Sequence, residues 1–267
     1  MISVDEQKEL IATGHAMAEA ARAAILPWFR DTGLISDNKL DDGFDPVTEA
    51  DRAAETAMRA VLADRRPNDA IHGEEFGRQP GTSGLTWVLD PIDGTRAFIS
   101  GTPTWGVLIA VGGEAGPELG IIDQPYIGER FVGGFGLAEM TGPQGARTLG
   151  TRSTAELEAA TIFTTFPEVG NKAERTAFHR LASHCKLTRY GVDCYAYALL
   201  AAGHIDLVVE AGLNAYDIQA PIALIQASGG IVTDWKGGPA HHGGRALAAA
   251  NPDIHAAALA ILSEADG

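Results

Sequence analysis

The sequence has few cysteines and few positive charges. Its 267 residues include two cysteines, Cys185 and Cys194, and no Cys-x-x-Cys pair of the kind that binds a metal. We therefore expect two free thiols in a reducing compartment. Lys and Arg number 20 against 35 Asp and Glu, which gives a formal charge of −15. This balance argues against nucleic acid and against an anionic membrane as partners, because both require a basic surface.

Long apolar runs and export signals are also lacking. No uninterrupted apolar stretch approaches the length of about 20 residues that a membrane-spanning helix needs. The opening MISVDEQ carries acids where a signal peptide has a basic start and then an apolar run. We therefore expect a cytoplasmic protein. The composition, 45% hydrophobic and 21% charged, is typical of a globular chain that buries a sizeable core.

The order of helical and strand-like patterns predicts an α/β (α+β) fold in two halves. Residues 4–30 and 49–69 have helical spacing, and a polar loop or hairpin joins them. Strand-like stretches then follow at hairpin intervals, which predicts an antiparallel meander. We expect a single domain over residues 1–267, with a half 1–145 that carries the metal motifs and an alternating α/β half 146–267. The expected strands are 70–77, 85–90, 105–113, 117–125, 128–136, 160–166, 186–191, 205–212 and 230–235, and the later helices are 171–185, 193–203, 215–230 and one from Pro252.

The stretch WVLDPIDGTRAF, residues 87–98, brings two carboxylates together at a strand end. Asp90 stands on the last residue of an apolar strand, which we expect to end at Pro91 because proline cannot donate to a sheet. Asp93 lies in the turn that follows. The two carboxylates and the carbonyl oxygen of Ile92 can then face one space, and such hard oxygen ligands suit Mg²⁺.

Neighbouring residues and three other acidic segments extend this pattern. Gly94 permits a tight reversal, and Thr95 suits the cap of a helix, whose first N–H groups bind anions. Each further acid stands at the end of an element, where a solvated turn or a helix cap is the alternative explanation. Together they are more numerous than capping requires. These acids are Glu74 and Glu75 in HGEEFG, Asp217 in NAYDIQAP, and Asp45 and Asp51 in FDPVTEAD, where Thr48 lies between them.

Other phosphate chemistries fit the spacing less well. Phosphatases with a nucleophilic aspartate carry D-x-D after a strand, whereas this chain has D-x-x-D with a proline between. A G-x-x-x-x-G-K-[ST] loop for nucleotides does not occur. His241 and His242 in KGGPAHHGG lack further ligands at metal spacing, so we interpret this segment as a surface loop. An anionic substrate on so acidic a chain requires cations at the site.

The four acidic motifs together resemble the inositol monophosphatase family of Mg²⁺-dependent phosphatases. The quoted stretches are WVLDPIDGTRAF, HGEEFG, FDPVTEAD and AYDIQAPIALIQASGG, and the similarity spans residues 5–255 in the order of the family. The resemblance implies a layered αβαβα sandwich, usually a homodimer, that hydrolyses a small phosphate monoester with metal-activated water. It also implies two to three Mg²⁺ ions in each active site.

The resemblance assigns roles to single residues. Glu74, Asp90 and the carbonyl of Ile92 would hold one Mg²⁺, and Asp90, Asp93 and Asp217 would hold a second. The hydroxyl of Thr95, paired with Asp45, would orient and help deprotonate the attacking water. The main-chain N–H groups of Gly94 and Thr95 would bind the phosphate.

Two longer stretches resemble the bacterial histidinol-phosphate phosphatase branch, which serves histidine biosynthesis. They are DGTRAFISGTPTWGVLIAV and YGVDCYAYALLAAGHIDLVVEAGLNAYD. On this resemblance Asp193 and Glu210 face the non-phosphate end of the substrate, where acids suit a cationic amine and an imidazole. A helix N-cap at Asp193 and a polar strand end at Glu210 are the alternatives. Inositol-1-phosphate, other sugar phosphates and 3′-phosphoadenosine-5′-phosphate remain alternative substrates, and an inactive binding homologue is a remote one.

Overall fold

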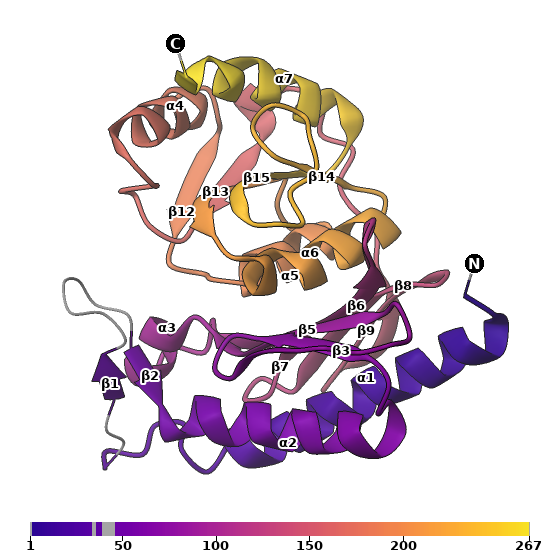
Figure 1. Ribbon diagram of the computed structural model, residues 1–267. Coiled ribbons are helices and arrows are strands. Elements are labelled where there is room, and N and C mark those ends of the chain that lie inside the picture. Colours follow the sequence, from indigo (N-terminus) through magenta and orange to yellow (C-terminus); the bar gives the residue numbers. More distant parts are fainter. Residues whose placement is uncertain (1, 34–35, 39–45, 267) are drawn as a thin grey trace.

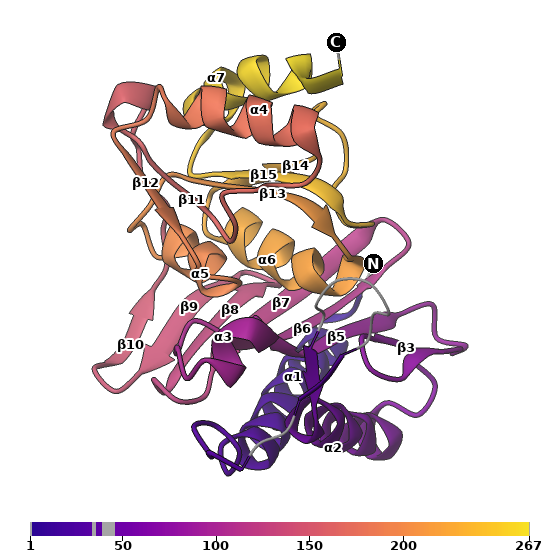
Figure 2. The same ribbon diagram turned by 90° about the vertical axis from the view of Figure 1, so that its left-hand side faces the viewer.

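The chain folds into five layers in which helices and sheets alternate (Figure 1). The computed structural model describes residues 2–33, 36–38 and 46–266. Turning the molecule by 90° shows the same order of layers, with the central helices between the two sheets (Figure 2). The predicted αβαβα sandwich is therefore confirmed. The outer helices are α1 (Val4–Ile25) and α2 (Glu49–Arg65) on one side and α4 (Lys172–Ala182) and α7 (Pro252–Leu262) on the other, and the central helices are α5 (Tyr195–Ala201) and α6 (Ala215–Ala227).

The first sheet has eight strands in the order β10-β9-β8-β7-β6-β5-β3-β4. The run from β5 to β10 is antiparallel, as the hairpin intervals predict. β3 pairs parallel with β5, because the chain first turns back through β4 at the sheet edge. The sequence did not predict β4, β9 or β10. The strands are β3 (Ala70–Gly73), β4 (Gly77–Gln79), β5 (Thr86–Asp93), β6 (Gly106–Gly113), β7 (Gly116–Gln124), β8 (Glu129–Gly134), β9 (Leu137–Gly142) and β10 (Gly145–Thr148).

The second sheet has five strands in the order β12-β11-β13-β15-β14. Three of them are parallel, which matches the predicted α/β character of this half. The sequence did not predict β15, because its core is a run of alanines, which are depleted in strands. The strands are β11 (Thr161–Thr164), β12 (Leu187–Tyr190), β13 (Leu207–Leu213), β14 (Ile231–Thr233) and β15 (Gly244–Ala249), and a separate short hairpin pairs β1 (Ser36–Asn38) with β2 (Pro46–Thr48).

Two predicted boundaries differ from the structure. The first helix ends at Ile25 and not near residue 30, because Pro27 has no N–H group with which to continue the helical hydrogen bonds. β5 does not end at Pro91 but continues to Asp93. The pairing shifts register between Asp90 and Asp93, so the proline lies in a bulge where it needs no ladder hydrogen bond. This bulge brings both aspartates to the same end of the strand.

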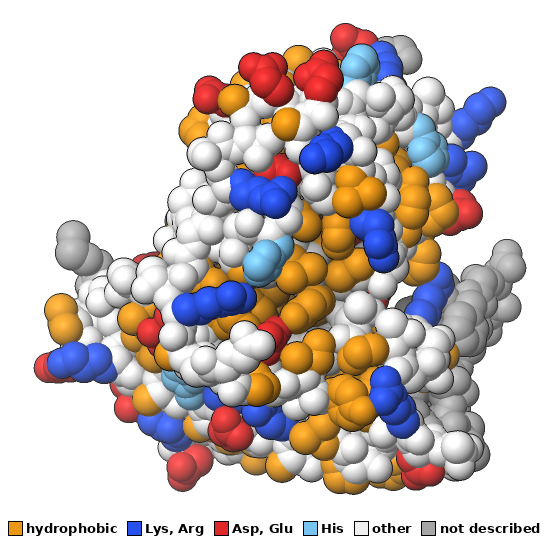
Figure 3. Space-filling view, turned by 180° about the vertical axis from the view of Figure 1, so that it is seen from behind, with side chains coloured by type: hydrophobic (Ala, Val, Ile, Leu, Met, Phe, Trp, Pro, Cys, Tyr) orange, Lys and Arg blue, Asp and Glu red, His pale blue; other side chains and the backbone are white. Residues whose placement is uncertain are grey.

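Apolar residues fill the spaces between the layers. One cluster lies between α1, α2 and the first sheet and includes Trp87 and Trp105, and a second lies between the sheets around α5 and α6. A third packs α4 and α7 on the second sheet. Seen from behind, hydrophobic side chains gather in the middle of the surface, with charged side chains of both signs around them (Figure 3).

Two sequence expectations concern the chain as a whole. Cys185 and Cys194 are both free thiols, as expected. Within the part of the chain that the structure describes, every helix is too short or too polar to cross a bilayer.

Candidate active site

A cavity of about 300 Å³ lies where the two halves of the chain meet. Every residue to which the family resemblance assigns a role lines it, except Asp45, which lies outside the described residues. Segments far apart in the sequence therefore converge: the end of β5, the start of α3 (Thr95–Ile99), the start of α5 and the junction of β13 with α6. The predicted residues that line the cavity are Glu74, Asp90, Ile92, Asp93, Gly94, Thr95, Asp193, Glu210 and Asp217.

Three of these acids form a cluster of suitable size for a cation. Asp90, Asp93 and Asp217 each offer a carboxylate oxygen, and these oxygens all lie within 4.8 Å of one another. Asp90 is buried, and the other two are half-buried. Hard carboxylate oxygens around one point are the ligands that Mg²⁺ and Ca²⁺ prefer. The donor set thus fits a divalent cation.

Main-chain N–H groups hold the three carboxylates in place. The amide of Ile92 donates to Asp90 Oδ1 at 3.1 Å, within the bulge of β5. The amide of Cys194 donates to Asp93 Oδ2 at 2.7 Å, so the second half of the chain anchors a residue of the first. The amide of Asn214 donates to Asp217 Oδ2 at 2.6 Å in the capping box of α6. The cluster is therefore preorganised by the backbone.

The electrostatics of the cluster favour a positive ion. Burial raises the pKa of Asp90 well above its ordinary value, and the nearby carboxylates of Glu74, Asp93 and Asp217 raise it further. Burial likewise raises the pKa of Asp93, and Asp217 and Asp193 add to the effect. Among the described residues that line the cavity, only Arg96 is positively charged. A divalent cation between the carboxylates would offset their mutual repulsion.

Gly94 has the left-handed backbone that suits the predicted tight reversal, but the role of Thr95 differs from the predicted one. We expected Thr95 to cap the helix, but Gly94 is the N-cap of α3 and has a left-handed φ of 87°. The Thr95 hydroxyl instead donates to the carbonyl oxygen of Ile92 at 3.2 Å. A side chain at position 94 would meet the Cγ of Asp193 at 2.8 Å, so the close approach of the second half also requires glycine.

Asp193 and Glu210 are both held inside the cavity by hydrogen bonds, and neither is simply a helix cap or a solvated strand end. Asp193 is not the N-cap of α5, because Cys194 takes that position. It has a left-handed φ of 46°, accepts a hydrogen bond from Thr104 Oγ1 at 3.1 Å, and has a pKa raised by burial to about 6. Glu210 is only 7% exposed and accepts three hydrogen bonds from Thr164 and Thr165. Burial raises the pKa of Glu210 to about 7.

For Asp51 the capping alternative is the correct one. Thr48 is the N-cap of α2, and Asp51 completes a capping box by accepting from the Thr48 amide at 2.8 Å and from its hydroxyl at 2.6 Å. Asp51 is buried and does not line the cavity.

Sequence reasoning missed several other lining residues. Phe166 follows β11, and the Arg96 guanidinium carbon lies 5.0 Å from the centroid of its ring. Arg96 directly follows Thr95, so its position next to a predicted site residue was a usable signal. The others come from the second half, and only the tertiary fold shows that they reach the site. The missed residues are Arg96, Thr165, Phe166, Cys194, Tyr197, Ala211, Gly212, Leu213, Asn214 and Tyr216.

This fold and this site define a phosphatase of the inositol monophosphatase family, to which the chain belongs: the family model matches residues 6–266. The protein is therefore a phosphomonoesterase of a metal-dependent family. The bifunctional phosphatase IMPL2 of Arabidopsis thaliana chloroplasts is 41% identical over 239 residues, 88% of this chain and 67% of that protein. A histidinol-phosphatase of Chlorobaculum parvum is 34% identical over 88% of this chain and 89% of its own. A solved inositol monophosphatase structure from Zymomonas mobilis is 40% identical, with a TM-score of 0.85 and coverage of 98% and 99%.

Proposed function

We propose that the protein is a Mg²⁺-dependent histidinol-phosphate phosphatase. The observation that supports this substrate is a further pair of acids in the cavity. Asp193 and Glu210 line it together with the cluster of Asp90, Asp93 and Asp217. A substrate with a phosphate at one end and a cationic amine at the other matches these two groups of acids. The relative named histidinol-phosphatase is consistent with this choice.

The metal ligands that the family resemblance implies are consistent with the cluster of Asp90, Asp93 and Asp217. Glu74, Asp90 and the carbonyl oxygen of Ile92 would hold one Mg²⁺, and Asp90, Asp93 and Asp217 would hold the second. When bound, Mg²⁺ supplies the positive charge that neutralises the phosphate and the Lewis acidity that activates water. Two to three ions offset both the carboxylates and an incoming phosphate dianion on a chain of charge −15.

The protein's own groups would position the reactants. The amides of Gly94 and Thr95 open a helix, where N–H groups lack intrahelical partners, and they would donate to the phosphate oxygens. The Thr95 hydroxyl, which lies against the Ile92 carbonyl, would orient the attacking water. The pairing of Thr95 with Asp45 stays a prediction.

The charges of Asp193 and Glu210 suit a cationic leaving group. With a pKa of about 6, Asp193 is mostly ionised at pH 7.5, and Glu210, with a pKa of about 7, is ionised in most molecules. The amine of histidinol is protonated at that pH, whereas inositol offers hydroxyl groups alone. We also propose that the protein is a homodimer and that it acts in the cytoplasm.

A panel of phosphate esters tests the substrate. We expect kcat/KM for histidinol phosphate to exceed that for inositol-1-phosphate and glycerol-2-phosphate by about 10- to 100-fold, the effect of one or two hydrogen bonds to a charged group. Phosphate release in Mg²⁺ is the measurement. A preference for inositol-1-phosphate would instead support the second candidate, which the similarity to the Zymomonas mobilis structure favours. Release from no ester would mean an inactive homologue.

A variant of Asp193 tests how the amine is recognised. Asp193→Asn keeps the volume beside Gly94 and an acceptor for Thr104, but it removes the charge. We expect kcat/KM for histidinol phosphate to fall by about 10- to 100-fold, with little change for glycerol-2-phosphate. Equal losses on both esters would show that Asp193 acts through the structure of the site.

A further inference from the structure

The buried carboxylate of Glu55 is built into the turn that carries Glu74. Glu55 lies on α2, is fully buried and does not line the cavity. Its Oε2 accepts the amide of Glu75 at 2.7 Å, and its Oε1 accepts the amide of Phe76 at 3.2 Å. The two residues that follow Glu74 are thus tied to α2 by their main chain.

The backbone before and at Glu74 is equally constrained. A Cβ atom at Gly73 would lie 2.0 Å from Glu55 Oε1, so only glycine lets the carboxylate approach the strand this closely. On the other side, the amide of Glu74 donates to the carbonyl of Leu89 in β5 at 3.1 Å. The backbone of Glu74 is therefore held between β5 and the Glu55 carboxylate. Its partner on β5, Leu89, directly precedes Asp90.

Arg59 completes this arrangement one helical turn further along α2. Its Nε donates to Glu55 Oε1 at 2.8 Å, and its Nη2 donates to the carbonyl of Gly77 at 2.7 Å. The Arg59 guanidinium balances the buried charge of Glu55. Together, Glu55 and Arg59 bind the main chain of Glu75, Phe76 and Gly77, the residues that follow Glu74. Because a buried ion pair is often no more stable than well-packed apolar residues, stability alone gives weak reason for a charge here.

We propose that Glu55 is a positioning residue for Glu74 and thereby sets the affinity of the active site for divalent cations. This inference rests on the proposed role of Glu74 as a metal ligand. Groups that orient metal ligands typically change metal affinity by about 10- to 100-fold when they are replaced. Glu55→Gln keeps the shape of the side chain but removes its charge and one of its acceptor oxygens.

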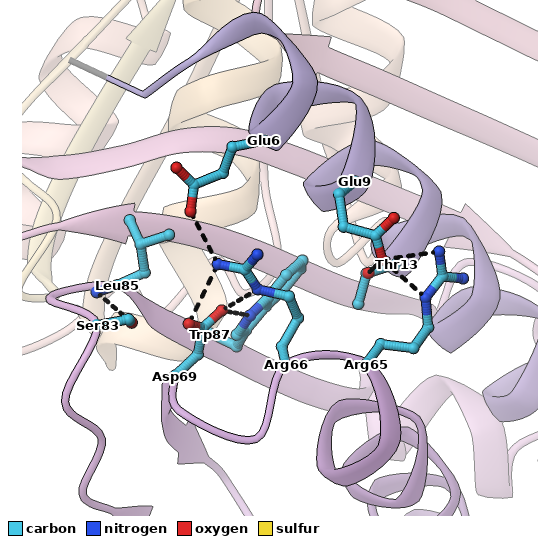
Figure 4. Close-up of polar contacts among 9 residues, drawn as sticks. All are labelled: Glu6, Glu9, Thr13, Arg65, Arg66, Asp69, Ser83, Leu85 and Trp87. Atoms are coloured by element: carbon cyan, nitrogen blue, oxygen red, sulfur yellow. Dashed lines mark hydrogen bonds and ion pairs between the residues drawn. The ribbon is translucent and has the colours of Figure 1, made fainter.

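Asp69 offers a matched control in the same half of the chain (Figure 4). It is a buried aspartate just before β3, at the end of that strand opposite Glu74. It accepts hydrogen bonds from Arg66 Nε at 2.7 Å and from Trp87 Nε1 at 2.9 Å. Arg66 Nη2 also donates to Glu6 Oε1 at 3.1 Å. Asp69→Asn therefore also removes a buried, paired carboxylate, but one remote from the metal ligands.

The test is calorimetric titration of Mn²⁺ into the metal-stripped proteins, with thermal unfolding of each. We expect both variants to have a lower Tm and only Glu55→Gln to raise the Kd for Mn²⁺, by about 10- to 100-fold. At saturating metal its kcat should return to within about threefold of the wild-type value, because the ligands themselves remain. Arg59→Lys, which cannot bridge Glu55 and Gly77 in the same way, should raise the Kd by a smaller factor.

Three results would overturn the proposal. The first is a wild-type Kd in a folded Glu55→Gln variant or, if that variant does not fold, a wild-type Kd in Arg59→Lys. The second is an equal rise of the Kd in Asp69→Asn, because this would mark a general effect of lost stability. The third is a wild-type protein that binds no Mn²⁺, which would remove the metal site itself and so identify a failure of the proposed function.

Discussion

Replacing Asp90 by Asn is expected to lower turnover by about 10³-fold or more, which corresponds to the several kcal/mol that a catalytic cation contributes. Asp90 is the one carboxylate that we assign to both ions, and it forms the cluster with Asp93 and Asp217. The measurement is phosphate release from histidinol phosphate at saturating Mg²⁺. Asp69→Asn is the control and should keep near-normal turnover.

The same variant should be more stable than the wild type when metal is absent. Burial and neighbouring carboxylates raise the folded-state pKa of Asp90 above its ordinary value of 3.8. The folded state then binds more protons than the unfolded state, so the metal-free wild type loses stability as the pH rises through and above 3.8. Asn does not titrate and escapes this loss. Thermal unfolding in chelator at pH 5 and pH 8 checks this, and a Tm for Asp90→Asn below that of the wild type at pH 8 would contradict it.

Replacing Thr95 by Ala is expected to lower kcat by about 10²- to 10⁴-fold, the usual contribution of a group that positions or transfers a proton. The Thr95 hydroxyl contacts the Ile92 carbonyl at 3.2 Å and is not among the clustered carboxylates, so the Kd for metal should change little. Measuring kcat and KM separately distinguishes lost water positioning from lost binding.

Thr95→Ser is the control for this role, because it keeps a hydroxyl at the same position. We expect it to recover most of the lost kcat. A Thr95→Ala variant in which only KM changes would show that the hydroxyl contributes to binding and not to the chemical step.

Much of the site could be predicted because its central motif is local. Asp90, Ile92 and Asp93 are nearly consecutive, so their spacing alone indicates convergent oxygen ligands. Glu74 and Asp217 were already candidates as acids at the ends of elements, the family resemblance assigned them ligand roles, and the structure brings both to the same cavity.

The errors lie where long-range packing decides the geometry. A proline usually ends a strand, but the register shift after Asp90 lets β5 continue past it. Thr95 has the residue type of a cap, but the bulge places the Ile92 carbonyl within reach of its hydroxyl. Glu55 and Arg59 are spaced like an ordinary surface ion pair on a helix, and only the packing of α2 against the turn after β3 shows that Glu55 is fully buried and Arg59 is half-buried.

The most direct test of the account is a calorimetric titration of Mg²⁺ and Mn²⁺ into metal-stripped wild-type protein and Asp90→Asn. We expect the wild type to bind at least two ions per chain, because two groups of oxygen ligands share Asp90. Asp90→Asn should lose both binding events, while its melting in chelator shows an intact fold. Binding of the same number of ions with unchanged affinity in Asp90→Asn would contradict the assignment of this cluster as the metal site of the phosphatase.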